Sequence, residues 1–215
     1  MQYIALIGDI VNSKGEARRG DLQRTLAAVL KENSERKPRL ASPYTITLGD
    51  EFQAVYKSAD NLFLDIFSIL AEIAPVQARF GIGIGELTTA INPKQALGMD
   101  GPAFHRARDS ITILKKSGYL IRLEGDPPPQ GEAYNHWKLL NNLLDFVSHK
   151  MIAWEPNRLR ILVGLLKGDS VAELERKLGV SNVAVYKNIN AGPLDELLGL
   201  CHEITNLLNR ELKSR

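Results

Sequence analysis

The chain has 215 residues, of which 44% are hydrophobic and 24% charged, and its formal net charge is +2 at pH 7, as expected for a soluble globular protein of one or two domains. No apolar run approaches the roughly 18 residues of a membrane span, and the N-terminus has no signal-peptide pattern. A single cysteine, Cys201, excludes an internal disulfide, so we expect a cytoplasmic protein.

The first strands predicted along the chain carry acidic residues at their ends. A short apolar run typical of a strand buried on both faces stops before Asp9. Two alternating runs then flank a Gly-Asp turn, so Asp50 and Glu51 lie at the tip of a predicted hairpin. The predicted strands are residues 3–7, 44–48 and 52–56.

Asp9 and Asp50 have two interpretations. If their strands are neighbours, the two carboxylates lie within several ångströms, and like charges that close favour a bound cation such as Mg²⁺. Alternatively, Asp9 caps the following helix and Asp50 only forms the turn.

A long helical pattern over about 14–34 follows Asn12 and Ser13, either of which can be its N-cap. The free N–H groups of this helix start, with Lys14, predict an anion site for phosphates beside the carboxylates. The basic residues of the first turn are otherwise a solvated helix face.

Residues 79–86 alternate glycine with isoleucine at strand period, so one strand face has almost no side chains. Such a face allows close approach of a helix or a flat ligand. The spacing does not match the dinucleotide-binding fingerprint, because the third glycine is displaced and no helix follows directly. A helix with Ala103, Phe104 and Ala107 on one side then leads to a strand over 119–123.

Three consecutive prolines within 126–131 form the clearest break in the sequence. We therefore expect one domain over 1–126 and a proline-rich linker with a connector helix over 127–156. A helical domain is expected over 157–215.

The pattern over 170–189 predicts a helix, a glycine turn and a second helix capped by Ser181, with a shared apolar core, and it resembles the bacterial helix-turn-helix module. Asn and Lys side chains on the second helix suit base edges or phosphates of DNA. The residues expected to contact DNA are Ser181, Asn182, Val183, Tyr186, Lys187 and Asn190. The alternative is a helical hairpin that packs on the first domain or on a partner protein.

Charge gives the DNA-binding hypothesis limited support. Residues 158–190 hold six Lys and Arg against three acidic residues. A weakly positive module binds DNA best when a homodimer presents it twice, and its binding should depend strongly on salt. The apolar stripe over 193–212 must be buried, either within this chain or between two protomers.

Four segments resemble, in order and spacing, the palm domain of class III nucleotidyl cyclases and GGDEF cyclases. The residues within these segments are similar to those of the SatD family of bacterial proteins. The segments are 7–10, 47–52, 80–86 and 100–108. The resemblance implies an α+β fold, a ferredoxin-like antiparallel sheet backed by helices. It also implies that Asp9 and Asp50 bind metal, with Glu51 adjacent and the carbonyl of Ile10 beside the ion.

The departures from the cyclase pattern concern catalysis. Ile46 stands where cyclases use a lysine to select adenine, and His105 and Asp109 stand near the transition-state Asn and Arg. Arg106 or Arg108 can reach phosphate only from a shifted register. Cyclisation needs those positive charges, so the resemblance favours nucleotide binding over ordinary cyclase activity.

The sequence thus predicts a DNA-binding transcriptional regulator whose cyclase-like palm binds a nucleotide and Mg²⁺ or mediates dimerisation. The alternative is a metal-dependent nucleotidyl- or phosphoryl-transfer enzyme with an accessory helical domain.

Overall fold

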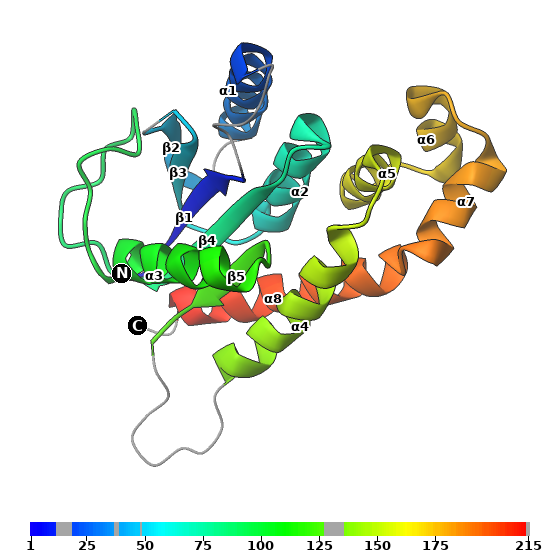
Figure 1. The fold of residues 1–215 in the computed structure, drawn as a ribbon. Coiled ribbons are helices and arrows are strands. Elements are labelled where there is room, and N and C mark those ends of the chain that lie inside the picture. The colour runs from blue at the N-terminus through cyan, green and yellow to red at the C-terminus, as the bar shows by residue number, and fades with distance from the viewer. Residues whose placement is uncertain (12–18, 37–38, 48, 127–135, 214–215) are drawn as a thin grey trace.

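The computed structural model describes residues 1–11, 19–36, 39–47, 49–126 and 136–213, which form an α+β fold built on a five-stranded sheet (Figure 1). The strands are β1 Tyr3–Ile10, β2 Leu40–Ile46, β3 Glu51–Tyr56, β4 Ala78–Gly85 and β5 Ile121–Glu124. The helices are α1 Arg19–Glu35, α2 Leu62–Ile73, α3 Pro102–Ser117, α4 His136–Met151, α5 Pro156–Leu166, α6 Val171–Leu178, α7 Asn182–Ala191 and α8 Leu194–Lys213. In the part of the chain described, no helix is both long and apolar enough to cross a bilayer.

The sheet has the strand order β2-β3-β1-β4-β5, with antiparallel pairs except between β4 and β5, which are parallel. The central strand β1 continues to Ile10, three residues beyond its predicted end, so Asp9 lies within the strand. In the register, Asp9 is opposite Glu51 of β3 and Arg79 of β4. The predicted hairpin is present, with Ile46 opposite Phe52 across its turn.

The two faces of the sheet are covered by different helices. Phe80, Ile82 and Ile84 of β4 belong to one core cluster with α1 and α2. Ala5 and Ile7 of β1 point to the other face and pack with α3 in a second cluster. This alternation follows from the two-residue period of strands.

The bare face of β4 is occupied by helix α3. A Cβ atom added at Gly83 would lie 2.0 Å from the carbonyl oxygen of Ala103, and one at Gly81 would lie 2.2 Å from that of Ala107. Backbone therefore packs directly on backbone, which only glycine permits. The sequence allowed either a helix or a flat ligand on this strand face, and in the structure a helix packs there.

Helix α4, expected as a connector, packs against the sheet edge at β5. The amide of Asn141 accepts a hydrogen bond from the N–H of Leu123 (3.0 Å) and donates one to its carbonyl (2.8 Å). Asn141 is buried, so these bonds satisfy backbone groups that would otherwise lack a partner at the sheet edge.

The stripe of α8 is buried within the same chain, which decides between the two predicted possibilities. The stripe belongs to the core cluster shared with α1, α2 and α4. At its C-terminal end, the side chain of Asn209 accepts a hydrogen bond from the N–H of Ala59 (2.8 Å) and donates one to Asp60 (2.7 Å). Burial also raises the pKa of the Cys201 thiol to about 12, so this thiol is unreactive.

The contact between α3 and β4 predicts the effect of a single methyl group. Gly83→Ala should lower the free energy of unfolding by about 3 kcal/mol or more, because the methyl group meets helix backbone that cannot move aside. Gly199→Ala is the matched control. Gly199 lies in α8 with open space around it, so the same change there should stabilise by about 0.5–1 kcal/mol. Urea unfolding measures both, and equal effects would contradict the close packing.

Candidate functional site

The structure brings the predicted metal-binding residues to one end of the sheet. The N–H of Ile10 donates a hydrogen bond to the carbonyl of Asp50 (3.0 Å), which joins β1 to the hairpin turn. Asp9 and Glu51 are directly opposite in the register, so their side chains project to the same face of the sheet. The backbones of Asp9, Asp50 and Glu51 are therefore neighbours at this end of the sheet, and a shared cation between the carboxylates of Asp9 and Asp50 stays a prediction.

The carboxylate of Asp9 already has two cationic partners. Arg79 Nη1 lies 3.2 Å from Oδ2 and Lys115 Nζ lies 2.9 Å from Oδ1. The Asp9 side chain is only 11% exposed, whereas that of Lys115 is 50% exposed. Within the described ranges, no three His, Cys, Asp or Glu side chains form a group that could hold a metal ion. A metal ion at Asp9 would have to displace Lys115.

The predicted phosphate-binding residues do not join this group. Asn12, Ser13 and Lys14 lie outside the described residues. Arg106 is held by ion pairing to Asp126 and by a hydrogen bond to the carbonyl of Ile84.

Arg106 also lies far from Asp9 along the sheet. It packs beside Gly85, which is opposite Tyr3 at the start of β1, six residues from Asp9. Six residues of strand span roughly 20 Å. Arg108 is exposed on α3. Lys115, at the other end of α3, is the residue of this helix that reaches Asp9.

The second candidate site is the helix pair α6 and α7. Ser170 and Glu173 form a capping box at the start of α6, and Gly179 ends this helix with a left-handed backbone (φ 65°). Ser181 caps α7, because its hydroxyl accepts a hydrogen bond from the N–H of Ala184 (3.2 Å). These local signals were visible in the sequence, and they produce the predicted helices and the short turn between them.

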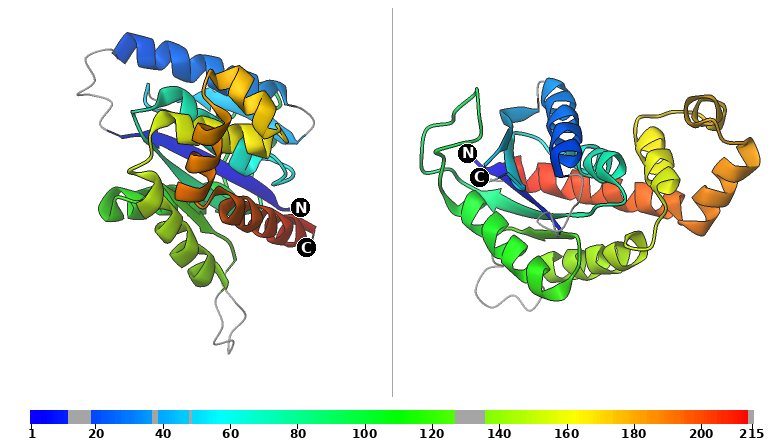
Figure 2. Two further views of the ribbon diagram at one scale, coloured as in Figure 1. Left: turned by 90° about the vertical axis from the view of Figure 1, so that its right-hand side faces the viewer. Right: turned by 45° about the horizontal axis from the view of Figure 1, so that its top comes forward.

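One face of α7 is buried and the opposite face is exposed. Val185 and Ile189 belong to the core, whereas Val183 is 76% exposed and Tyr186 is 52% exposed. The other residues predicted to contact DNA are also exposed, and they are Ser181, Asn182, Lys187 and Asn190. The helix pair lies at the end of the molecule remote from the sheet, as both figures show (Figures 1 and 2). This face of α7 is therefore open to a large partner.

The model of the SatD family matches residues 3–189. The chain belongs to the SatD family. No curated protein matches this SatD-family chain. Among solved structures it is similar to a bacterial light-regulated adenylyl cyclase, at 14% identity and a TM-score of 0.42, over 57% of this chain and 43% of that one. The SatD-family chain thus covers less than half of that cyclase, and the likeness is too weak to carry an argument about activity.

A buried polar network of the SatD-family chain was not predicted from the sequence. Asp65 of α2 accepts hydrogen bonds from the Tyr56 hydroxyl (2.7 Å) and from Arg36 (2.9 Å). Asn33 donates to the carbonyl of Asp65 (3.2 Å), and the Tyr44 hydroxyl bonds to that of Tyr56. The only signal in the sequence is an acidic residue within the apolar helix over 62–73, where a charge needs buried partners.

The environment of Asp65 predicts a dependence of stability on pH. Burial outweighs the hydrogen bonds and raises the pKa of Asp65 from 3.8 to about 6. Because the pKa of Asp65 is raised in the folded protein, protonation of Asp65 stabilises the fold. This contribution to the free energy of unfolding is full below pH 3.8 and is lost as the pH rises through 6. Relative to Asp65→Asn, the natural protein should gain on the order of 2 kcal/mol between pH 7 and pH 4. Urea unfolding of both proteins tests this, and parallel pH profiles would contradict it.

The magnesium site stays a prediction, and competition with Lys115 provides its test. If Asp9 holds a cation, Lys115→Met should strengthen Mg²⁺ binding by roughly tenfold, because a competing charge is removed. Lys116→Met, next to it on α3, is the control and should change nothing. Isothermal calorimetry measures both, and Asp9→Asn combined with Asp50→Asn should abolish the heat. Equal binding by all four proteins would exclude the site.

Proposed function

We propose that this SatD-family protein is a DNA-binding transcriptional regulator, in which α6 and α7 form a helix-turn-helix and α7 is the recognition helix. The observation that carries the proposal is the exposed face of α7. Polar and aromatic side chains cover it, although the opposite face of the same helix is buried. Val183 and Tyr186 are one helical turn apart, so their exposed side chains lie next to each other on this face.

The chemistry of this face suits nucleic acid. Asn182 and Asn190 can bond base edges in the major groove, and Lys187 can pair with a phosphate. Tyr186 can contact the sugar-phosphate backbone through its hydroxyl. Ser181 lies at the N-terminus of α7, where the helix dipole favours phosphate, so this end of the helix adds a phosphate contact.

The position of α6 supports the same proposal. It is joined to α7 by Gly179, Val180 and Ser181, and it packs on α5, so two helices hold the recognition helix from behind. Lys177 at the end of α6 is paired with Asp169. On α7 itself, the cation of the exposed face is Lys187. One such module gives little charge, and we propose that a homodimer presents two of them.

For the sheet domain we propose a ferredoxin-like palm of cyclase type. Its strand order and the antiparallel directions of β1 to β4 fit that description. The two cations at Asp9 favour a structural or dimerising palm over a catalytic one, because a metal-dependent transfer reaction needs free carboxylates. The enzyme alternative is therefore not the function that the geometry supports best.

The proposal predicts a specific loss of DNA affinity. Lys187→Ala should weaken binding to a 30-base-pair duplex by about three- to tenfold at low salt and should reduce the salt slope by about one. The reason is the loss of one phosphate contact. Fluorescence anisotropy of the labelled duplex, at several salt concentrations, measures both quantities.

The control has the same charge change on another surface. Lys116→Ala, exposed at the end of α3, should leave the affinity within twofold of the natural protein. Equal losses in the two variants would mean that binding is diffuse and that α7 is no recognition helix. Absence of binding by the natural protein at low salt would also refute the proposed function.

A further inference from the structure

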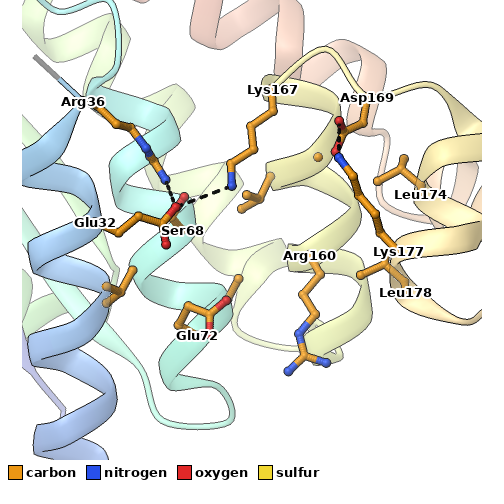
Figure 3. A pocket seen from close by; sticks show the side chains of 14 residues that line it. Glu32, Arg36, Ser68, Glu72, Arg160, Lys167, Asp169, Leu174, Lys177 and Leu178 are labelled. Carbon is orange, nitrogen blue, oxygen red and sulfur yellow. Dashed lines mark hydrogen bonds and ion pairs between the residues drawn. The ribbon is translucent and has the colours of Figure 1, made fainter.

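One unassigned feature is a pocket of about 530 Å³ between the sheet domain and the helix pair (Figure 3). Its walls come from α1, α2, α5 and α6, so segments far apart in the sequence enclose it. It is lined by Val29, Glu32, Arg36, Ser68, Ala71, Glu72, Arg160, Val163, Gly164, Lys167, Asp169, Leu174, Lys177 and Leu178. Nothing in the proposed DNA contact uses these residues.

The lining has one more cation than it has anions. Its basic residues are Arg36, Arg160, Lys167 and Lys177, and its acidic residues are Glu32, Glu72 and Asp169. Two of these cations are firmly paired, Arg36 with Glu32 (2.8 Å) and Lys177 with Asp169 (2.6 Å).

The remaining two cations are available to a ligand. Lys167 is 3.8 Å from Glu32, at the outer limit of an ion pair, and Glu32 is already bonded to Arg36. Arg160 forms no side-chain hydrogen bond or ion pair with any residue that the structure describes. Arg160 belongs to α5 and Lys167 directly follows its last residue; both line the pocket, and Lys167 points toward Glu32 (Figure 3). An anion could pair with Arg160 directly and would compete with Glu32 for Lys167.

A second observation also points to a ligand. The Ser68 hydroxyl lines the pocket, is buried with the residue only 4% exposed, and has no hydrogen-bond partner among the described residues. Buried hydroxyl groups without a partner are uncommon, because losing the bond to water costs free energy. A bound molecule with a polar group would satisfy it.

The rest of the lining is apolar. Five aliphatic side chains from all four helices provide surface for a hydrocarbon or ring, and they are Val29, Ala71, Val163, Leu174 and Leu178. A pocket of this size, with apolar walls and a few polar groups, is typical of small-molecule sites.

We propose that this pocket binds a small organic anion, a phosphate or carboxylate group carried on an apolar body. Arg160 and Lys167 pair with the anionic group, the Ser68 hydroxyl bonds a polar atom of the ligand, and the aliphatic walls hold the body. Because α6 forms one wall, a bound ligand also fixes α6 against α1 and α2. The consequence for DNA affinity rests on the proposed function, but the binding itself does not.

Phenyl phosphate is the probe, because it combines a dianion with an apolar ring, and inorganic phosphate is the comparison without the ring. We expect a saturable rise in the melting temperature of the full chain with phenyl phosphate, at lower concentration than with inorganic phosphate. Arg160→Gln should weaken the apparent affinity by about tenfold or more, because one charged hydrogen bond is lost. Lys116→Gln, an equal charge change on exposed α3, should leave it unchanged.

Ser68→Ala separates binding from folding. Because the hydroxyl has no partner, this variant should melt no lower than the natural protein, yet bind phenyl phosphate several-fold more weakly. A non-saturable shift, or the same shift in Arg160→Gln and Lys116→Gln, would overturn the proposal.

These measurements use no DNA, so their failure is distinct from failure of the recognition helix. If phenyl phosphate binds but does not change the anisotropy titration with the duplex, the binding site is supported and its coupling to α7 is refuted.

Discussion

The burial of α8 within its own chain is the constraint on which the position of the helix pair relative to the sheet depends. This helix has 20 residues, roughly 30 Å, and its stripe of buried side chains is continuous with the core under the sheet. Its N-terminal residues Leu194 and Leu197 pack beside α7, whereas Asn209 near its other end bonds the backbone before α2. One rigid element therefore ties the helix pair to the sheet domain, and the pocket between them has walls that do not depend on a flexible linker.

Two buried carboxylates show how the sheet domain handles charge. Asp65 is enclosed more completely and is stabilised by neutral hydroxyls together with Arg36, so burial dominates and its pKa rises. Asp9 lies at the end of the sheet, where Arg79 from the next strand and Lys115 from α3 both reach it. The cost of burying a carboxylate is met in both places by residues distant in sequence. At Asp9 this arrangement competes directly with metal binding, which makes Lys115 the decisive residue.

Local signals in the sequence predicted much of the fold. The glycine alternation over 79–86 predicted a bare strand face, and Ser181 predicted the start of α7, because both effects depend on neighbours in the chain. The direction in which α3 runs across the sheet could not be predicted from such local signals. It places Arg106 beside Asp126 and Lys115 beside Asp9, so Lys115 and not Arg106 lies at the end of the sheet that holds Asp9. The lining of the pocket was also hidden, since its members are dispersed over residues 29–178.

The close spacing of α5 and α6, which connects the pocket to α7, depends on one glycine. A Cβ atom at Gly164 would lie 2.2 Å from Leu174 Cδ2, so α6 can approach α5 this closely only because that side chain is absent. The same approach brings Lys177 and Leu178 into the pocket wall and sets where the turn at Gly179 begins. Because α7 starts three residues later, any displacement of α6 is passed to α7 through a turn too short to absorb it. The proposed ligand, held against α6, would therefore act on α7 through this short turn, without requiring a change in the sheet domain.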